Sequence, residues 1–388
     1  MNAARLSLGS LGLCALIASC TPFHRNQVAW IDGSSDAVNG GRSTLNVRWS
    51  RTIGEGGAYI PVENASTAFD HVRDRLYVGS SDGQFLALDS RGRRYFEYDP
   101  EAGVEAAPAV DTRRGEVYVA AEDGRVHALT FTGEVLWVGS AGGTVRQSPL
   151  LEEDVIYIAR EDDAVVAMDR TNGEVFWTYR RDGNVEFSVS GHAGLAATDD
   201  AIITGFSDGT VVALDRTDGT IRWQRVTAVD VEPEEGTARQ FFDVDTTPVL
   251  HEGVLYVASF TAGVYALDPA SGSVLWREEG FSGVTGIAAH ERMLILASAL
   301  EGVRAYDLRL REVVWQRDNE SGAPTQPVVA VPFVLVGETL GALRALRIEG
   351  GEEVSRIDTS TGFSAPPLAY RRYGFAMSNG GVLIAFII

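Results

Sequence analysis

Apolar and polar positions recur along this chain with a period of about forty residues. The stretch LYVGSSDGQFLALD, residues 76–89, contains two apolar runs of strand length on either side of a Ser-Asp-Gly turn, which is the pattern of a β-hairpin. Similar stretches follow at 117–129, 156–169, 202–215, 255–268 and 294–307, with weaker copies at 334–347 and 374–386. The pattern predicts eight hairpins.

The spacing between copies is regular except in two places. Equivalent positions in the first run are Tyr77, Tyr118, Tyr157, Ile203, Tyr256, Ile295, Leu335 and Phe375, with intervals of 41, 39, 46, 53, 39, 40 and 40 residues. One structural unit of about forty residues therefore repeats eight times, and the two long intervals indicate insertions.

Each hairpin is followed by a third and a fourth element. A turn of the Thr/Ser-x-Gly type leads into a strand that ends in an aromatic residue, as in 171–177, 217–223 and 271–276, and Trp137 and Trp315 occupy the same place. A further strand precedes the next hairpin and often carries a proline: Pro108, Pro149, Pro248, Pro327 and Pro366. Four strands per unit are typical of β-propeller blades, and the innermost strand tolerates proline because one of its edges is unpaired.

The two ends of the repeat region complement each other. The chain stops at Ile388, after the second hairpin strand, so the eighth unit lacks its outer strand. Residues 45–53 form a strand-like segment without a hairpin of their own. We therefore predict that residues 43–388 are an all-β, eight-bladed β-propeller of four-stranded antiparallel blades, closed by the N-terminal strand joining the last blade. An open array would leave two unprotected sheet edges.

The N-terminus has the pattern of an export signal. Arg5 precedes an apolar run from Leu6 to Ala18, which is too short for a stable membrane-spanning helix, and Ile17-Ala-Ser-Cys20 resembles a lipobox. We predict a lipoprotein signal peptide at 1–19, lipid attachment (diacylglycerol plus an acyl chain such as palmitate) at Cys20, and a flexible tether at 20–42. Thr21, where an Asp would resemble an inner-membrane retention signal, favours the outer membrane. An ordinary signal peptide with a chance cysteine is the alternative.

Composition narrows the function classes. The formal charge of −20 argues against nucleic acid and against anionic lipid headgroups as partners. Both cysteines, Cys14 and Cys20, precede the repeats, so the propeller has no thiol for a disulfide, a metal site or a nucleophile. The six histidines lack metal-ligand spacing, and the Asp-Gly pairs at hairpin turns are explained by turn geometry. We predict no catalytic, cofactor-binding or metal-binding residue.

The two long intervals carry the irregular segments of the repeat region. One contains residues 184–192, and the other contains 229–248, which is acidic first and then aromatic. Long connections on a rigid scaffold are frequent sites of function. Because the two segments lie on neighbouring blades, we expect them to share one surface patch.

The repeat Ala-Leu-Asp-x-x-x-Gly-x-x-x-Trp resembles that of quinoprotein-type (PQQ-like) propellers. The resemblance implies that each tryptophan docks on the backbone of the next blade. It also introduces an enzymatic alternative, a PQQ-dependent dehydrogenase. That class is typified by a longer chain, calcium ligands beside a catalytic Asp and often a vicinal cysteine pair, whereas no cysteine follows Cys20.

Residues 243–249, DVDTTPV, resemble the same connection in the BamB-type lipoproteins of the outer-membrane β-barrel assembly machinery. The resemblance implies a non-catalytic, lipid-anchored scaffold on the periplasmic face of the outer membrane. Asp243 and Asp245 match the family's Asp pair, which contacts the periplasmic domains of the central barrel component. Phe187 and Val189 match an apolar pair, whereas Ser190 stands where that family has an Arg.

The implied partners are a BamA-like barrel assembly protein and other lipoproteins of the same machinery, and unfolded outer-membrane protein strands remain a further partner class. We add Phe241 and Phe242, beside the Asp pair, to the predicted partner-binding residues. Local capping of loop amides is the structural alternative for the two aspartates. A propeller lipoprotein with an unrelated periplasmic partner also remains open.

Overall fold

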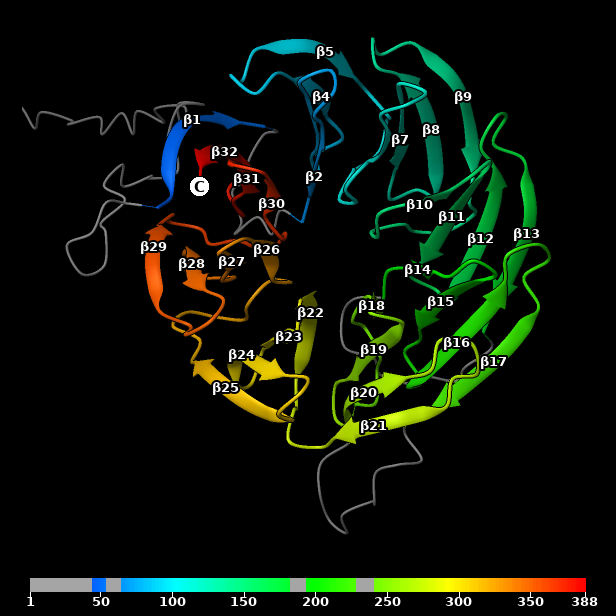
Figure 1. Ribbon diagram of the computed structural model, residues 1–388. Coiled ribbons are helices and arrows are strands. Elements are labelled where there is room, and N and C mark those ends of the chain that lie inside the picture. The colour runs from blue at the N-terminus through cyan, green and yellow to red at the C-terminus, as the bar shows by residue number, and fades with distance from the viewer. Residues whose placement is uncertain (1–43, 54–63, 182–192, 228–240) are drawn as a thin grey trace, which may run out of the picture.

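The computed structural model describes residues 44–53, 64–181, 193–227 and 241–388, and in these residues every regular element is a β-strand. The 32 strands form eight four-stranded antiparallel sheets, arranged as blades around a central axis (Figure 1). The predicted all-β, eight-bladed propeller is confirmed. No helix in this described part of the chain is long and apolar enough to cross a membrane.

The first four blades each run from the innermost to the outermost strand in chain order. Their strands are β2 (Thr67–Asp70), β3 (Arg75–Gly79), β4 (Phe85–Leu88) and β5 (Arg94–Tyr98); β6 (Ala109–Asp111), β7 (Glu116–Ala120), β8 (Arg125–Thr130) and β9 (Val135–Ser140); β10 (Leu150–Glu152), β11 (Val155–Arg160), β12 (Ala164–Asp169) and β13 (Val175–Arg180); β14 (Ala196–Ala197), β15 (Ala201–Gly205), β16 (Thr210–Asp215) and β17 (Ile221–Val226).

Blades 5 to 7 repeat this order, and blade 8 takes its outer strand from the N-terminal side. The strands are β18 (Val249–His251), β19 (Val254–Ser259), β20 (Gly263–Leu267) and β21 (Val274–Glu278); β22 (Val284–His290), β23 (Met293–Ser298), β24 (Gly302–Asp307) and β25 (Glu312–Arg317); β26 (Val328–Ala330), β27 (Phe333–Gly337), β28 (Leu343–Arg347) and β29 (Glu353–Ile357); β30 (Leu368–Tyr370), β31 (Tyr373–Met377), β32 (Val382–Ile387) and β1 (Asn46–Thr52).

The apolar hairpin runs form the core because the second and third strands of each blade are covered on both faces by neighbouring blades. Strand β4 is buried throughout, whereas the outer strand β9 has only exposed and half-buried positions. Each hydrophobic cluster joins two adjacent blades, as where Tyr118 and Val126 pack with Ile156 and Val166. Continuous apolar runs are expected for strands buried on both sides.

The structure corrects one detail of the innermost strands. Pro108, Pro149, Pro248 and Pro327 lie one residue before the first hydrogen-bonded residue of β6, β10, β18 and β26, not within the strands. These strands are only three residues long. Because proline has no N–H to donate to the ladder, it marks the point where pairing begins.

The ring closes as predicted, through β1. Strand β1 pairs antiparallel with β32, from Asn46 opposite Ile387 to Thr52 opposite Val382 (Figure 1). The N–H of Ile53 donates to the carbonyl of Gly381 at 2.8 Å, and Leu45 and Ile53 are fully buried. The first described strand of the chain therefore completes the last blade.

Five tryptophans of the outer strands dock on the following blade, as the repeat implied. Their indole N–H groups donate to backbone carbonyls of that blade at 2.7–3.2 Å, in the pairs Trp49–Ser90, Trp137–Arg170, Trp177–Arg216, Trp223–Pro269 and Trp315–Ile348. Each ring covers a glycine with positive φ, in order Gly92, Gly173, Gly219, Gly272 and Gly351. Because a Cβ there would meet the ring at 2.4–3.0 Å, glycine is required on steric as well as conformational grounds.

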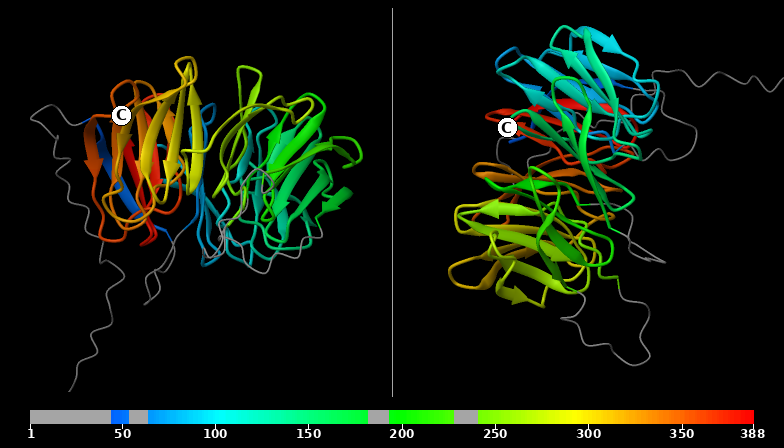
Figure 2. Two further views of the ribbon diagram at one scale, coloured as in Figure 1. Left: turned by 90° about the horizontal axis from the view of Figure 1, so that it is seen from below. Right: turned by 90° about the vertical axis from the view of Figure 1, so that its right-hand side faces the viewer.

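The strands run between two faces of the ring, which are seen edge-on in Figure 2. In an antiparallel blade, the turn between the second and third strands lies at the same end as the connection to the next blade. We call this end the connection face. The turns of the other type, including the tryptophan-docking turns, form the opposite face.

Candidate functional site

A cavity of about 590 Å³ opens around the axis, and the inter-blade connections line it. Its walls include Glu105 and Arg146 on one side and Asp243 and Asp245 on another, with backbone and small side chains such as Ala365 between them. Of the charged residues among the described lining, only Arg146 is basic. The channel mouth is therefore acidic.

The connection 241–248, which carries the predicted Asp pair, is fixed by the hairpin of blade 5. The hydroxyls of Thr261 and Ser259 donate to the carbonyls of Phe241 and Phe242 at 2.5 and 2.8 Å. The N–H of Phe260 donates to the carbonyl of Asp243 at 2.9 Å. Three backbone carbonyls of the predicted site residues thus hold this connection to blade 5.

Blade 4 holds the same connection from the other side. The N–H of Val244 donates to the carbonyl of Phe206 at 3.2 Å, and the Val244 side chain is fully buried between the two blades. Gly205 makes room for it, since a Cβ there would lie 2.2 Å from the carbonyl oxygen of Val244. Alternation along an extended backbone then turns Asp243 and Asp245 towards the channel.

The two carboxylates lie in a poorly solvated position. Asp243 is 1 % exposed and Asp245 is partly buried. Burial, followed by the charges of Asp243 and Asp163, raises the pKa of Asp245 to about 8. Oδ1 of Asp245 is buried and has no hydrogen-bond partner within the described residues. In the free protein this carboxyl is therefore largely protonated at neutral pH, and a cation at the channel mouth would favour its ionised form.

The two phenylalanines differ in exposure. Phe241 is exposed and contacts the ring of Phe260 edge-on, with 6.3 Å between centroids, whereas Phe242 is half-buried. The structure thus places all four described residues of the predicted site on one connection, with Phe241 outermost. Phe187, Val189 and Ser190 lie outside the described residues, as do the signal peptide, Cys20 and the tether.

Sequence reasoning missed the charge cluster on the other side of the channel. Arg146 contacts the carboxylates of Glu105, Glu122 and Glu161 at 2.8–2.9 Å. Glu122 and Glu161 occupy the same turn position in neighbouring blades, which was the available signal. Three carboxylates share one guanidinium, so this side of the mouth also carries excess negative charge. No group of three or more His, Cys, Asp or Glu side chains in the described ranges is arranged so that it could hold a metal ion.

Comparison with known proteins identifies the family. The model of the family "Outer membrane protein assembly factor BamB" matches residues 42–129 and 109–317, which is more than half of the chain. The chain belongs to the BamB family. Outer membrane protein assembly factor BamB of Yersinia pestis is 24% identical over 283 residues, 68% of each chain, and that of Burkholderia pseudomallei is 27% identical over 244 residues, 62% of this chain and 60% of its own length. The matched region thus spans about two thirds or less of these relatives.

Solved structures support the same fold. BamB from Moraxella catarrhalis superposes with a TM-score of 0.75 at 22% identity, over 89% of this chain and 100% of that one. The quinohemoprotein alcohol dehydrogenase from Comamonas testosteroni superposes with a TM-score of 0.67 at 14% identity, over 89% of this chain and 76% of that one. At such identities the likeness concerns the propeller and does not extend to the chemistry.

Proposed function

We propose that this BamB-family chain is a non-catalytic scaffold of the outer-membrane β-barrel assembly machinery. It is anchored at Cys20 to the outer membrane on the periplasmic side, and it binds the periplasmic domains of a BamA-like central component through the connection 241–248. Membership of the BamB family supports the assembly role. The anchor and its orientation rest on the sequence around Cys20, which lies outside the described residues.

The main support for the proposed contact is the burial of the Asp pair, with one carboxylate oxygen of Asp245 lacking a hydrogen bond in the described part of the chain. Hydrogen bonds from blades 4 and 5 fix the backbone of this connection, yet Oδ1 of Asp245 is left without a partner among the described residues. A buried acceptor without a partner is costly, and a guanidinium or ammonium group supplied by another protein would remove that cost. The acidic channel mouth would also attract such a group before contact.

The test is binding of the purified periplasmic domains of the central barrel component from the same organism, measured by calorimetry. The double change Asp243→Ala, Asp245→Ala should raise Kd by about tenfold or more, because truncating a desolvated charge pair costs at least about 2 kcal/mol. Circular dichroism and the melting temperature check that the variant is folded.

Asp154→Ala, Asp200→Ala is the matched control. It removes two exposed carboxylates from first-to-second-strand turns on the opposite face, so the change in net charge is equal. Equal weakening by both variants would mean that long-range charge, not the Asp pair, carries the effect. A folded Asp243 and Asp245 variant with unchanged Kd would disprove the contact and leave an unrelated periplasmic partner as the alternative.

A further inference from the structure

The turn between the second and third strands has a different chemistry on the two halves of the ring. Its third position is aspartate in the first four blades and then changes, in the order Asp82, Asp123, Asp162, Asp208, Thr261, Leu300, Leu340 and Gly380. An aspartate here stabilises the turn: Oδ1 of Asp123 accepts the N–H of Arg125, and Oδ1 of Asp208 accepts that of Thr210, both at 3.0 Å. Leucine gives up this bond.

The two leucines are also highly exposed. Leu300 is 65% and Leu340 is 70% exposed, so neither contributes much to the core. A single exposed leucine needs no explanation, but two at equivalent positions of neighbouring blades, each replacing a turn-stabilising residue, do.

The leucines continue an apolar surface that begins at Phe241. Phe241 contacts Phe260, whose carbonyl accepts the N–H of Gly283, and the carbonyl of Gly283 accepts the N–H of Ala299 beside Leu300. A Cβ on Gly283 would lie 2.6 Å from Cγ of Leu300, so the Leu300 side chain lies on this backbone. We call Phe241, Phe260, Leu300 and Leu340 the apolar arc.

One connection, residues 318–323, lies between the two leucines. Leu300, Asp318 and Gly322 are among the residues that line a shallow hollow of about 660 Å³ on one side of it. On the other side, the N–H of Leu340 donates to the carbonyl of Ser321 at 3.1 Å. The arc therefore spans blades 5 to 7 on the connection face and starts beside the Asp pair.

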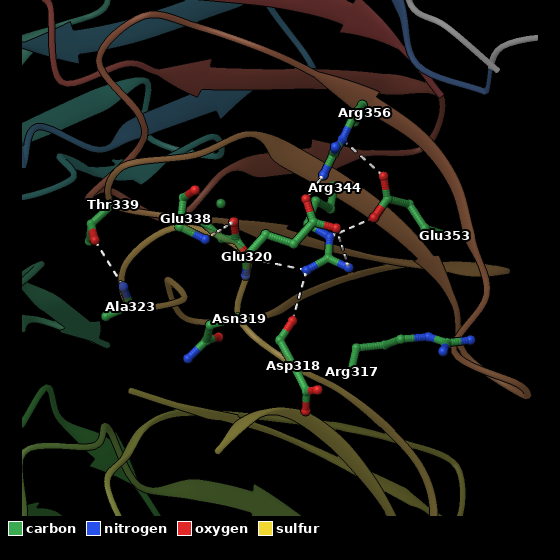
Figure 3. Close-up of polar contacts among 12 residues, drawn as sticks. Arg317, Asp318, Asn319, Glu320, Ala323, Glu338, Thr339, Arg344, Glu353 and Arg356 are labelled. Atoms are coloured by element: carbon green, nitrogen blue, oxygen red, sulfur yellow. Dashed lines mark hydrogen bonds and ion pairs between the residues drawn. The ribbon is translucent and has the colours of Figure 1, made fainter. Parts of the chain in front are cut away.

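Buried charges fix this connection (Figure 3). Glu338, only 2% exposed, accepts the N–H groups of Glu320 and Ser321 at 3.0 and 3.1 Å. The buried guanidinium of Arg344 donates to Glu338 at 3.0 Å, to Glu353 at 2.6 Å and to the carbonyl of Asp318 at 3.3 Å. Each buried charge thus has an opposite charge and further hydrogen bonds.

The network is particular to blade 7. In four other blades the position of Glu338 is a serine: Ser80, Ser259, Ser298 and Ser378. Buried ion pairs seldom add net stability compared with apolar packing. Here the pair holds the connection through hydrogen bonds to the backbone of Asp318, Glu320 and Ser321. A rigid, exposed connection is favourable for binding, because it loses little conformational entropy when a partner binds.

We infer that the apolar arc extends the docking surface of the Asp243–Asp245 connection. It receives a partner segment whose apolar side chains cover Leu300 and Leu340 and whose basic group faces Asp318. This inference rests on the proposed function. Charge complementarity supports the basic group: Asp318 is exposed at the hollow and, among the described residues, takes part in no ion pair, with one 3.4 Å hydrogen bond from Gln316.

The chain itself supplies a well-matched variant. Leu300→Asp, Leu340→Asp introduces the residue that the first four blades carry at this position, so the melting temperature should stay near that of the wild type. Kd for the purified periplasmic domains of the central barrel component should rise about tenfold or more, because two apolar anchors become charged. Leu300→Ala, Leu340→Ala is the second variant and should raise Kd about threefold or more. Asp318→Asn should raise it about twofold or more.

Leu310→Asp is the control on the same blade. Leu310 is 58% exposed and lies in the turn after β24, at the opposite end of the strand from Leu300. Its substitution should change Kd less than twofold. Equal weakening by this control would overturn the inference, since added charge anywhere would then suffice.

The remaining outcomes separate the arc from the Asp pair. If both leucine variants bind normally while the Asp243 and Asp245 variant is weakened, the arc is disproved and the proposed function stands. If neither set changes Kd, both fail. Sedimentation of the wild-type chain alone is the last measurement. A dimer that the leucine variant dissociates would identify a second copy as the occupant, which overturns the inference.

Discussion

Equivalent positions of the blades mostly carry the same residue type on one face of the propeller and differ from blade to blade on the other face. On the opposite face, five blade junctions repeat one device, a tryptophan that lies on a glycine and donates to a carbonyl of the next blade. On the connection face, the third turn position changes from aspartate to leucine between blades 4 and 6. Repetition marks the positions where packing determines the residue, and variation marks those that packing leaves free for recognition.

One of the three other junctions, between blades 5 and 6, also follows packing. Trp276 precedes blade 6, where Arg311 with φ +61° replaces the glycine, and the Arg311 guanidinium lies 4.6 Å from the Trp276 ring centroid. A cation–π contact thus takes the place of the ring-on-glycine contact. Leu300, by contrast, packs on Gly283 and still stays 65% exposed, and Leu340 is 70% exposed.

The largest test of the repeated device is removal of the closing strand. Deleting residues 43–53 should lower the melting temperature by more than about 10 °C. Burial of Leu45 and Ile53 stabilises the fold by roughly 1.5–3 kcal/mol each, the partly buried Trp49 adds to this, and β32 would keep only β31 as a partner. Differential scanning calorimetry measures the change.

A deletion of equal length within residues 25–35 of the predicted tether is the control, and it should leave melting unchanged. If the closing-strand deletion melts like the wild type, β1 is a dispensable arm and the ring is held by the other seven junctions.

The second test removes one glycine contact. A Cβ on Gly272 would lie 2.4 Å from the Trp223 ring, and φ there is +68°, so Gly272→Ala should destabilise the fold by about 2–4 kcal/mol. Gly253→Ala is the matched control: φ is +77°, yet nothing lies within 4 Å of the added Cβ. It should cost only about 1 kcal/mol. Equal losses in chemical denaturation would show that backbone strain, and not the tryptophan, requires glycine at Gly272.

The repeated part of the molecule was predictable from sequence because its residues answer to local rules. Paired apolar runs, the turns between them, including Asp-Gly turns, and the unmatched segment 45–53 were enough to predict eight blades and their closure. The residue at which each strand begins was not predictable, because the sequence does not show whether a proline such as Pro149 lies inside a strand or just before it. Hydrogen bonding alone distinguishes the two.

The candidate site remains a prediction as to its residues, and its electrostatics could not be read from the sequence. The irregular interval indicated the segment, and the resemblance to the BamB-type connection implied Asp243 and Asp245. Their burial depends on Val244 entering the space left by Gly205 in another blade. Arg344 and Glu338 show the same limit, because residues of one strand, one turn and one connection meet only in the fold. Leu300 and Leu340 had a sequence signal, visible only when the eight turns are aligned position by position.

The smallest expected effect concerns protonation at the connection face. Because burial raises the pKa of Asp245 to about 8, above its unfolded value of about 3.9, the folded state holds a proton that the unfolded chain releases. The stability from the protonated carboxyl is therefore complete below about pH 4 and is lost as pH rises towards 8. Asp245→Asn cannot ionise, so its unfolding free energy relative to the wild type should increase between pH 4 and 8.5. We expect a gain of about 1–2 kcal/mol, less than the full shift would give, because the carboxyl lines an open cavity.

Chemical denaturation of both proteins at half-unit pH steps measures this difference, and other titrating groups cancel in it. Asp243→Asn gives a further test, since it removes the second-largest cause of the raised pKa of Asp245. The loss of stability with rising pH should then be complete below pH 8. Binding gives the matching result: a basic partner group favours the ionised carboxyl, so wild-type Kd should fall between pH 6.5 and 8.5 while that of Asp245→Asn stays level. A pH-independent stability difference would contradict the raised pKa, and a level wild-type Kd would separate Asp245 from the partner's cation.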